Sequence, residues 1–130
     1  MPEFNYLAIL VAALSAFFLG GIWYSHKVFG GIWGHDAHMK EKKNGHPKYV
    51  YAFAFLFYLI SASAFAWFLG EGASLERSLT LAIVIGSCWV ATSFAVNYLF
   101  AGRGWRMLLV DAGYHFAQFL LYGLIFGLWH

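Results

Sequence analysis

Four long apolar stretches constrain this 130-residue chain more than any other feature of its sequence. They cover about residues 4–24, 49–69, 79–100 and 107–129. Because a helix rises about 1.5 Å per residue, a stretch of roughly 20 residues can cross a hydrocarbon core of about 30 Å. Backbone groups in lipid must bond within their own segment, and the stretches do not alternate polar and apolar residues. We therefore predict an all-α integral membrane protein with four transmembrane helices.

The composition and the connections predict how these helices are arranged. Hydrophobic residues make up 62% of the chain and charged residues 11%, whereas soluble domains average roughly a quarter charged residues. No linker or low-complexity segment divides the sequence, so we predict a single membrane domain over residues 1–130. The short connections at 70–77 and 101–105 force consecutive helices to lie side by side in opposite directions. This predicts an antiparallel four-helix bundle.

The connection after the first apolar stretch, residues 25–48, is the longest. Its first half mixes apolar and charged side chains, namely Val28, Phe29, Ile32 and Trp33 with Lys27 and His35. Such a mixture next to a membrane helix is typical of the headgroup layer, so we predict a short interfacial segment here. The same connection holds four residues of types that bind zinc: His35, Asp36, His38 and His46. No cysteine accompanies them and polar loops often contain histidine, so we predict a solvated loop and no metal.

The distribution of the basic residues predicts the orientation in the membrane. Seven of the eight lie in two connections: Lys27, Lys40, Lys42, Lys43, Lys48, Arg103 and Arg106. Only Arg77 lies on the other side. Since short cytoplasmic loops collect Lys and Arg, we expect both termini to lie outside. The net charge of +2 follows from these loops, so it predicts contact with membrane lipids and no nucleic acid.

The last apolar stretch carries polar side chains at the spacing of one helix face. Asp111 and His115 are four residues apart, and Gln118 and Tyr122 continue the same face. We expect Asn97 of the third stretch to lie at a similar depth. Ionisable groups inside a membrane are costly and usually face the bundle interior or a water-filled cavity. This polar stripe is therefore the candidate functional site.

Three interpretations of the polar stripe stay open. An aspartate and a histidine in contact can pass a proton, which would suit a proton or solute pathway. Alternatively, Asp111 could pair with an arginine of the 101–106 connection or accept from Asn97, and His115 would then only join two helices. Haem ligation is the third interpretation, but only His26 approaches the depth of His115. We predict no cofactor.

Small and aromatic residues predict the packing. Gly123 and Gly127 form a GxxxG pair, which lets helix backbones approach closely; the sequence leaves open whether they pack within the chain or between copies. Five tryptophans near predicted helix ends are expected to be interfacial anchors: Trp23, Trp33, Trp67, Trp105 and Trp129. Cys88 and Trp89 lie in the middle of the third stretch, where we expect both to be buried. A single cysteine excludes an intrachain disulfide.

Two stretches carry a resemblance to a known family. They are "GGIWYSHKVFGGIW" (20–33) and "NYLFAGRGWRMLLVDAGYH" (97–115). With the four apolar stretches they resemble the bacterial membrane family catalogued as domain of unknown function 1761. Its specific positions are Trp23, Tyr24, Ser25, Phe29, Gly30, Trp33, Asn97, Tyr98, Gly102, Arg103, Gly113, Tyr114 and His115. The family commonly has proline directly after Trp-Tyr-Ser, where this chain has His26. The resemblance implies a four-helix bacterial membrane protein and supplies no catalytic residue.

These features predict a multi-pass protein of the bacterial inner (plasma) membrane that is not an enzyme, because no catalytic constellation is recognisable. One expected function is an oligomeric channel or a proton-coupled transporter of small solutes that uses the polar stripe. The alternative is a non-catalytic accessory or scaffold protein that binds lipid or a partner membrane protein. In either case we expect a homo-oligomer or a complex with a partner membrane protein.

Overall fold

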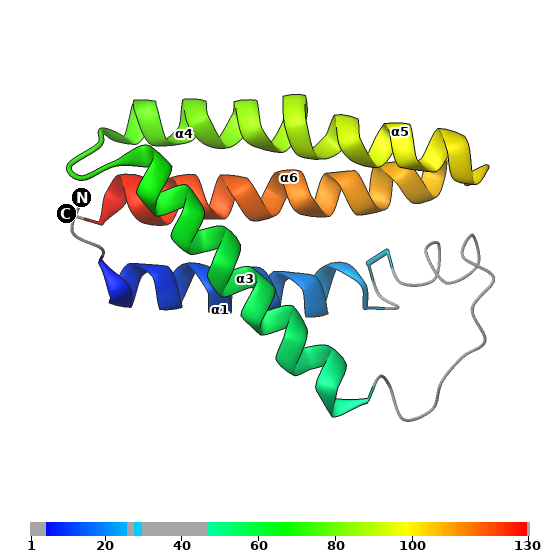
Figure 1. Cartoon of the computed structure of the whole chain (residues 1–130), viewed down its shortest axis with the longest axis horizontal. Helices are drawn as coiled ribbons and strands as arrows, with labels where there is room; N and C mark the ends of the chain where they lie inside the picture. The colour runs from blue at the N-terminus through cyan, green and yellow to red at the C-terminus, as the bar shows by residue number, and fades with distance from the viewer. Residues whose placement is uncertain (1–4, 26–27, 30–46, 130) are drawn as a thin grey trace.

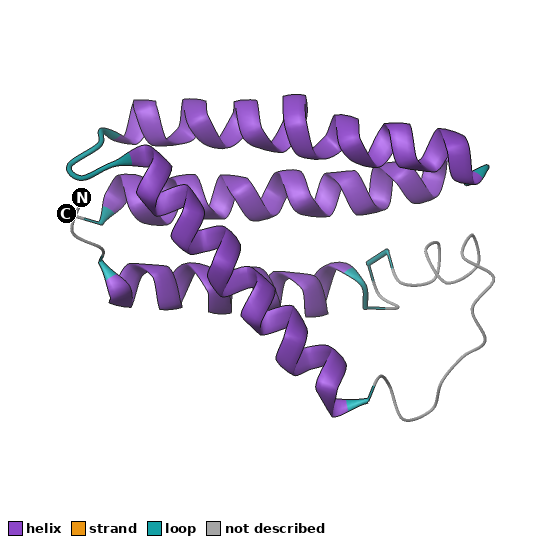
Figure 2. Ribbon diagram, in the orientation of Figure 1, coloured by secondary structure: helices purple, strands orange, loops and turns teal. Residues whose placement is uncertain are grey.

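The computed structural model describes residues 5–25, 28–29 and 47–129, and all regular secondary structure in these ranges is helical (Figure 2). The elements are α1 (Tyr6–Trp23), α3 (Lys48–Leu69), α4 (Leu75–Ile83), the π-helix η1 (Val84–Ala91), α5 (Thr92–Ala101) and α6 (Trp105–Leu128). α4, η1 and α5 follow one another without a break. The all-α prediction is confirmed. The interfacial segment and the histidines predicted between α1 and α3 lie largely outside the described residues.

Among the described residues, four helical segments are long and apolar enough to cross a membrane, as predicted. They span Tyr6–Trp23, Lys48–Leu69, Leu75–Ala101 and Trp105–Leu128. The third begins at Leu75 rather than at residue 79, because Ser74 caps it: the Ser74 hydroxyl accepts from the Arg77 backbone N–H at 3.1 Å. The apolar pattern alone missed this first turn, which is polar.

Contacts along α6 show that α1 and the α4–α5 segment run in the opposite direction to it. Leu75 at the start of α4 meets Gly127 near the end of α6, whereas Tyr98 near the end of α5 bonds to Asp111 near the start of α6. α1 likewise reaches the start of α6 with its last turn. In Figure 1 the axes of α1, α6 and the α4–α5 segment are roughly aligned, and α3 runs diagonally across α6 and α1 from a point beside α4. α3 packs chiefly on α1, and α6 contacts every other described helix.

The GxxxG pair packs within the chain, against α4. A Cβ atom on Gly123 would lie 2.8 Å from the Ala82 Cβ, and one on Gly127 would lie 2.8 Å from the Leu75 Cδ1. The Ser78 hydroxyl donates to the Gly123 carbonyl at 2.7 Å. Because the two backbones are this close, the α4–α6 contact settles the question that the sequence left open.

The middle of the third segment turns a different face inward from the one we predicted. Cys88 is exposed and Trp89 is 58% exposed, so the expectation that both are buried is wrong. Gly86 is buried instead, where an added Cβ would lie 3.1 Å from the Phe116 ring. The π-helix explains the difference, because its wider turn rotates the side chains relative to a regular α-helix.

Gly123→Ala is expected to lower the free energy of unfolding by about 1–3 kcal/mol, because the new methyl group overpacks the α4–α6 contact. Gly21→Ala is the matched control, since a Cβ there meets nothing within 4 Å. Unfolding by sodium dodecyl sulfate in detergent micelles measures both variants. If Gly123→Ala and Gly21→Ala are equally stable, the α4–α6 contact at Gly123 is not tightly packed.

Candidate functional site

Asp111 of α6 is the only acidic residue of the four spanning segments outside their first turns, and three elements meet at its carboxylate. The side chain is 8% exposed. The hydroxyl of Tyr24, at the C-terminal end of α1, donates to one carboxylate oxygen, and the hydroxyl of Tyr98 of α5 donates to the other. We call Tyr24, Tyr98 and Asp111 the Asp111 cluster. Through it a single carboxylate ties α1 and α5 to α6.

A tight turn places Tyr98 opposite Asp111. Gly102 ends α5 with a φ of 70°, in the left-handed region that glycine adopts without strain. The Arg103 backbone N–H bonds back to the Tyr98 carbonyl at 3.1 Å. α6 then begins at Trp105, so the chain reverses within a few residues. The last turn of α5 and the second turn of α6 consequently face each other.

The end of α1 is fixed against the same turn of α6. The Trp23 indole N–H donates to the Val110 carbonyl at 2.9 Å, and its ring lies over Gly113, where a Cβ would come within 3.3 Å. Trp23, expected only as an interfacial anchor, is therefore also an interhelical donor. Burial raises the pKa of the Tyr24 hydroxyl well above its ordinary value, and the hydrogen bond to Asp111 adds to this. The hydroxyl thus stays protonated and donates.

A second polar group lies further along α6 and connects it to α3. His115 Nδ1 lies 2.7 Å from Gln118 Oε1, and the Gln118 amide donates to the Tyr122 hydroxyl at 2.9 Å. That hydroxyl lies 2.7 Å from Ser61 Oγ on α3. We call His115, Gln118, Tyr122 and Ser61 the Gln118 cluster. The His115 ring also stacks on Phe94 of α5, with centroids 4.9 Å apart.

A tyrosine pair lies between the two clusters. The Tyr114 hydroxyl donates to the Ala16 carbonyl of α1 at 2.7 Å and lies 2.5 Å from the Tyr58 hydroxyl of α3. Gly20 leaves room for it, since a Cβ there would lie 3.3 Å from the Tyr114 oxygen. Three helices therefore meet at this pair too.

Four of the five predicted stripe residues lie in these clusters: Asp111, His115, Gln118 and Tyr122. Asn97 does not belong with them, because it is exposed whereas its neighbour Tyr98 is buried. Consecutive helical residues point about 100° apart, so Asn97 and Tyr98 lie on different faces of α5. The partners of the stripe residues have no polar spacing that would predict a site role; these are Tyr24, Tyr58, Ser61, Tyr98 and Tyr114. Three of these tyrosines stand at the positions that carried the family resemblance.

Hydrogen bonding is complete among the buried polar side chains of the described residues. In residues 5–25, 28–29 and 47–129, every buried side-chain nitrogen or oxygen has a hydrogen-bond partner. The same ranges hold no group of three or more His, Cys, Asp or Glu side chains that could bind a metal ion. The histidines of the long connection, and Lys40, Lys42 and Lys43, fall outside these ranges.

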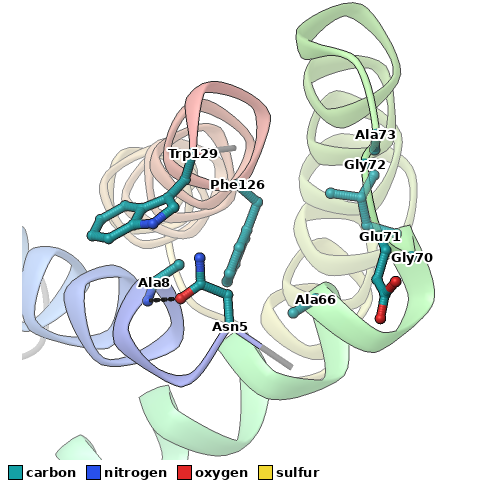
Figure 3. Close-up of a pocket in the computed structure, with 10 residues that line it drawn as sticks. Asn5, Ala8, Ala66, Gly70, Glu71, Gly72, Ala73, Phe126 and Trp129 are labelled. Atoms are coloured by element: carbon teal, nitrogen blue, oxygen red, sulfur yellow. Dashed lines mark hydrogen bonds between the residues drawn. The ribbon is translucent and has the colours of Figure 1, made fainter. Parts of the chain in front are cut away.

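A pocket of about 330 Å³ opens at the far end of the bundle from the Asp111 cluster. It lies between the start of α1, the α3–α4 turn and the end of α6 (Figure 3). Asn5, Phe126 and Trp129 lie on one side of it, and the Asn5 side-chain oxygen accepts from the Ala8 backbone N–H at 3.0 Å. The polar stripe of α6 does not line this pocket.

The fold and the buried clusters define the class: a membrane protein whose four apolar helices are joined by polar side chains. The family profile described as "Protein of unknown function (DUF1761)" matches residues 7–127, so the chain belongs to this family, as the resemblance predicted. No curated protein and no solved structure matches the chain significantly.

Tyr98→Phe is expected to lower the free energy of unfolding by about 1–3 kcal/mol, because it removes a hydrogen bond to a buried carboxylate. Tyr49→Phe is the control, since Tyr49 is 64% exposed. Unfolding by sodium dodecyl sulfate measures both. If Tyr98→Phe lowers the free energy of unfolding as little as Tyr49→Phe does, the role given to Tyr98 is wrong.

Proposed function

We propose that this chain is a membrane transport protein, either an oligomeric channel or a proton-coupled carrier of small solutes, with Asp111 as its proton-binding group. The Asp111 cluster carries this proposal. A buried carboxylate is costly inside a membrane and is read as functional by default. Here it also joins three helical segments, so a change at this one group acts on all of them.

Proton binding at Asp111 has a mechanical consequence. An ionised carboxylate only accepts hydrogen bonds, whereas a protonated one donates through one oxygen. Both oxygens accept from tyrosine hydroxyls. Uptake of a proton at one oxygen therefore requires the hydroxyl of Tyr24 or Tyr98 that donates to it either to reverse the hydrogen bond or to withdraw. Withdrawal would loosen α1 or α5 from α6. A proton-driven carrier needs this kind of link between proton binding and helix position.

The Gln118 cluster supports the same proposal. It adds a second ionisable group, His115, and continues the polar side chains along α6 toward α3. The polar groups thus follow α6 over about three turns, from Asp111 to Tyr122. Four helices enclose little space of their own, so we propose that a homo-oligomer or a partner membrane protein completes the pathway.

The four apolar helices and the distribution of basic residues support a proposal for the location. We propose a multi-pass protein of the bacterial inner membrane with both termini outside. The Lys48 and Arg103–Arg106 ends of the bundle then face the cytoplasm. The proposed activity moves a proton or solute without covalent chemistry, so the chain is proposed to be no enzyme.

One observation favours a second candidate function. Every buried polar side-chain atom in the described part of the chain has a partner, and this is equally typical of polar contacts that only join helices. In that case the chain is an accessory or scaffold protein that binds lipid or a partner membrane protein. The following experiment separates the two candidates.

Asp111→Asn is expected to slow the dissipation of a pH gradient imposed across proteoliposomes, because asparagine cannot take up the proton. An entrapped pH-sensitive dye follows the gradient, and empty liposomes give the background rate. The asparagine side chain still accepts from one tyrosine, so the protein should remain folded.

Asn97→Ser is the matched control, because Asn97 lies on the exposed face beside Tyr98. It should dissipate the gradient as fast as the unchanged protein. If the unchanged protein and Asp111→Asn behave alike, while Asp111→Asn unfolds more easily, the transport proposal is wrong and the scaffold function is supported.

The proposed orientation predicts that a reporter active only in the cytoplasm is silent when fused after His130. A reporter active only outside should be active at the same position. Fusions after Gly102, in the α5–α6 turn, should give the reverse pattern. The opposite result at both positions would overturn the assignment of the basic loops to the cytoplasm.

A further inference from the structure

A groove of about 410 Å³ runs along the outside of α4 beside the last turn of α3. It belongs to neither polar cluster of α6. Its lining includes the polar residues Glu76, Arg77 and Thr80 and the apolar residues Phe68, Leu81 and Val84. Phe68 is 55% exposed and Val84 is 41% exposed, so the apolar part of the groove is open to the surrounding lipid.

The charged end of the groove lies at the level of the lipid headgroups. The segment Leu75–Ala101 has 27 residues, which makes it about 40 Å long, compared with about 30 Å of hydrocarbon. Glu76 and Arg77 lie in its first turn. Within the described residues neither side chain takes part in an ion pair with the other or with a third residue. The groove therefore presents one anion and one cation side by side.

The rest of the groove points into the bilayer. Leu81 and Val84 follow Arg77 by four and seven residues, so they continue the same face of the helix about one and two turns deeper. Phe68 of α3 forms the opposite wall. The groove thus combines a charged end with apolar walls, which matches the charged headgroup and apolar chains of a lipid.

We propose that this groove binds one glycerophospholipid whose headgroup carries both a phosphate and an ammonium group, as in phosphatidylethanolamine. The Arg77 guanidinium pairs with the phosphate and the Glu76 carboxylate pairs with the ammonium group. One acyl chain lies along Phe68, Leu81 and Val84. An anionic headgroup that lacks an ammonium group would leave the Glu76 carboxylate without a partner. This site is independent of the transport proposal.

Native mass spectrometry of the detergent-purified protein tests the site with three probes: phosphatidylethanolamine, phosphatidylglycerol and diacylglycerol. An exposed ion pair changes affinity by up to about fivefold. The unchanged protein should therefore retain phosphatidylethanolamine up to about fivefold better than phosphatidylglycerol, and diacylglycerol least. Glu76→Gln should abolish the preference between the two phospholipids, and Arg77→Gln should weaken both by up to about fivefold.

Arg103→Gln is the matched control, since it removes an exposed cation at the other end of the bundle. It should leave the preference unchanged. Val84→Trp narrows the apolar part of the groove and should weaken all three probes. Helix content and oligomer size, measured on each variant, report folding.

Equal retention of the three probes by the unchanged protein would overturn the proposal. So would a preference that Glu76→Gln and Arg77→Gln leave intact. Displacement of the lipid by the water-soluble headgroup glycerophosphoethanolamine at equal concentration would overturn the role of the apolar walls.

Discussion

The structure depends on one constraint: a polar side chain on a membrane helix must find a hydrogen-bond partner within the protein, because the hydrocarbon offers none. α6 carries more buried polar side chains than any other described helix, and it is also the helix that contacts all the others. Asp111, Tyr114, Gln118 and Tyr122 lie on its buried side. Each bonds to a group on α1, α3 or α5, or to a neighbour that does. The central position of α6 follows from this requirement.

The two ends of α6 are held by different means. Near its start, tyrosine hydroxyls and an indole N–H reach across from α1 and α5. Near its end, Gly123 and Gly127 bring the α4 backbone within van der Waals contact. Hydrogen bonds through long side chains tolerate small displacements, whereas backbone contact through glycine does not.

The outward faces obey the same constraint locally. The hydroxyls of Ser87, Thr92 and Ser93, near the π-helix, donate to backbone carbonyls one turn earlier. Polar side chains can thus lie on the outside of the third segment without a partner helix. The groove beside α4 that is lined by Glu76 and Arg77 differs, because these two charged side chains make no such local hydrogen bond. This difference is the reason to assign it a lipid.

The sequence by itself determined the four spanning helices and the polar face of α6. Apolar length is a property of each segment alone, and the spacing of Asp111, His115, Gln118 and Tyr122 places them on one side of any helix. Their partners could not be predicted in the same way. Tyr24, Tyr58 and Tyr98 lie in other segments, where the sequence predicts an apolar packing residue or an interfacial anchor equally well.

The tertiary structure decided which helices meet and at what height. The Gly102 turn selected Tyr98 rather than Asn97 as the partner of Asp111, and the π-helix turned Cys88 and Trp89 outward. Packing against α4 assigned Gly123 and Gly127 to an intrachain contact. The reason is that helical periodicity fixes angles within one helix, while the rotation and depth of one helix against another depend on the packing of all of them together.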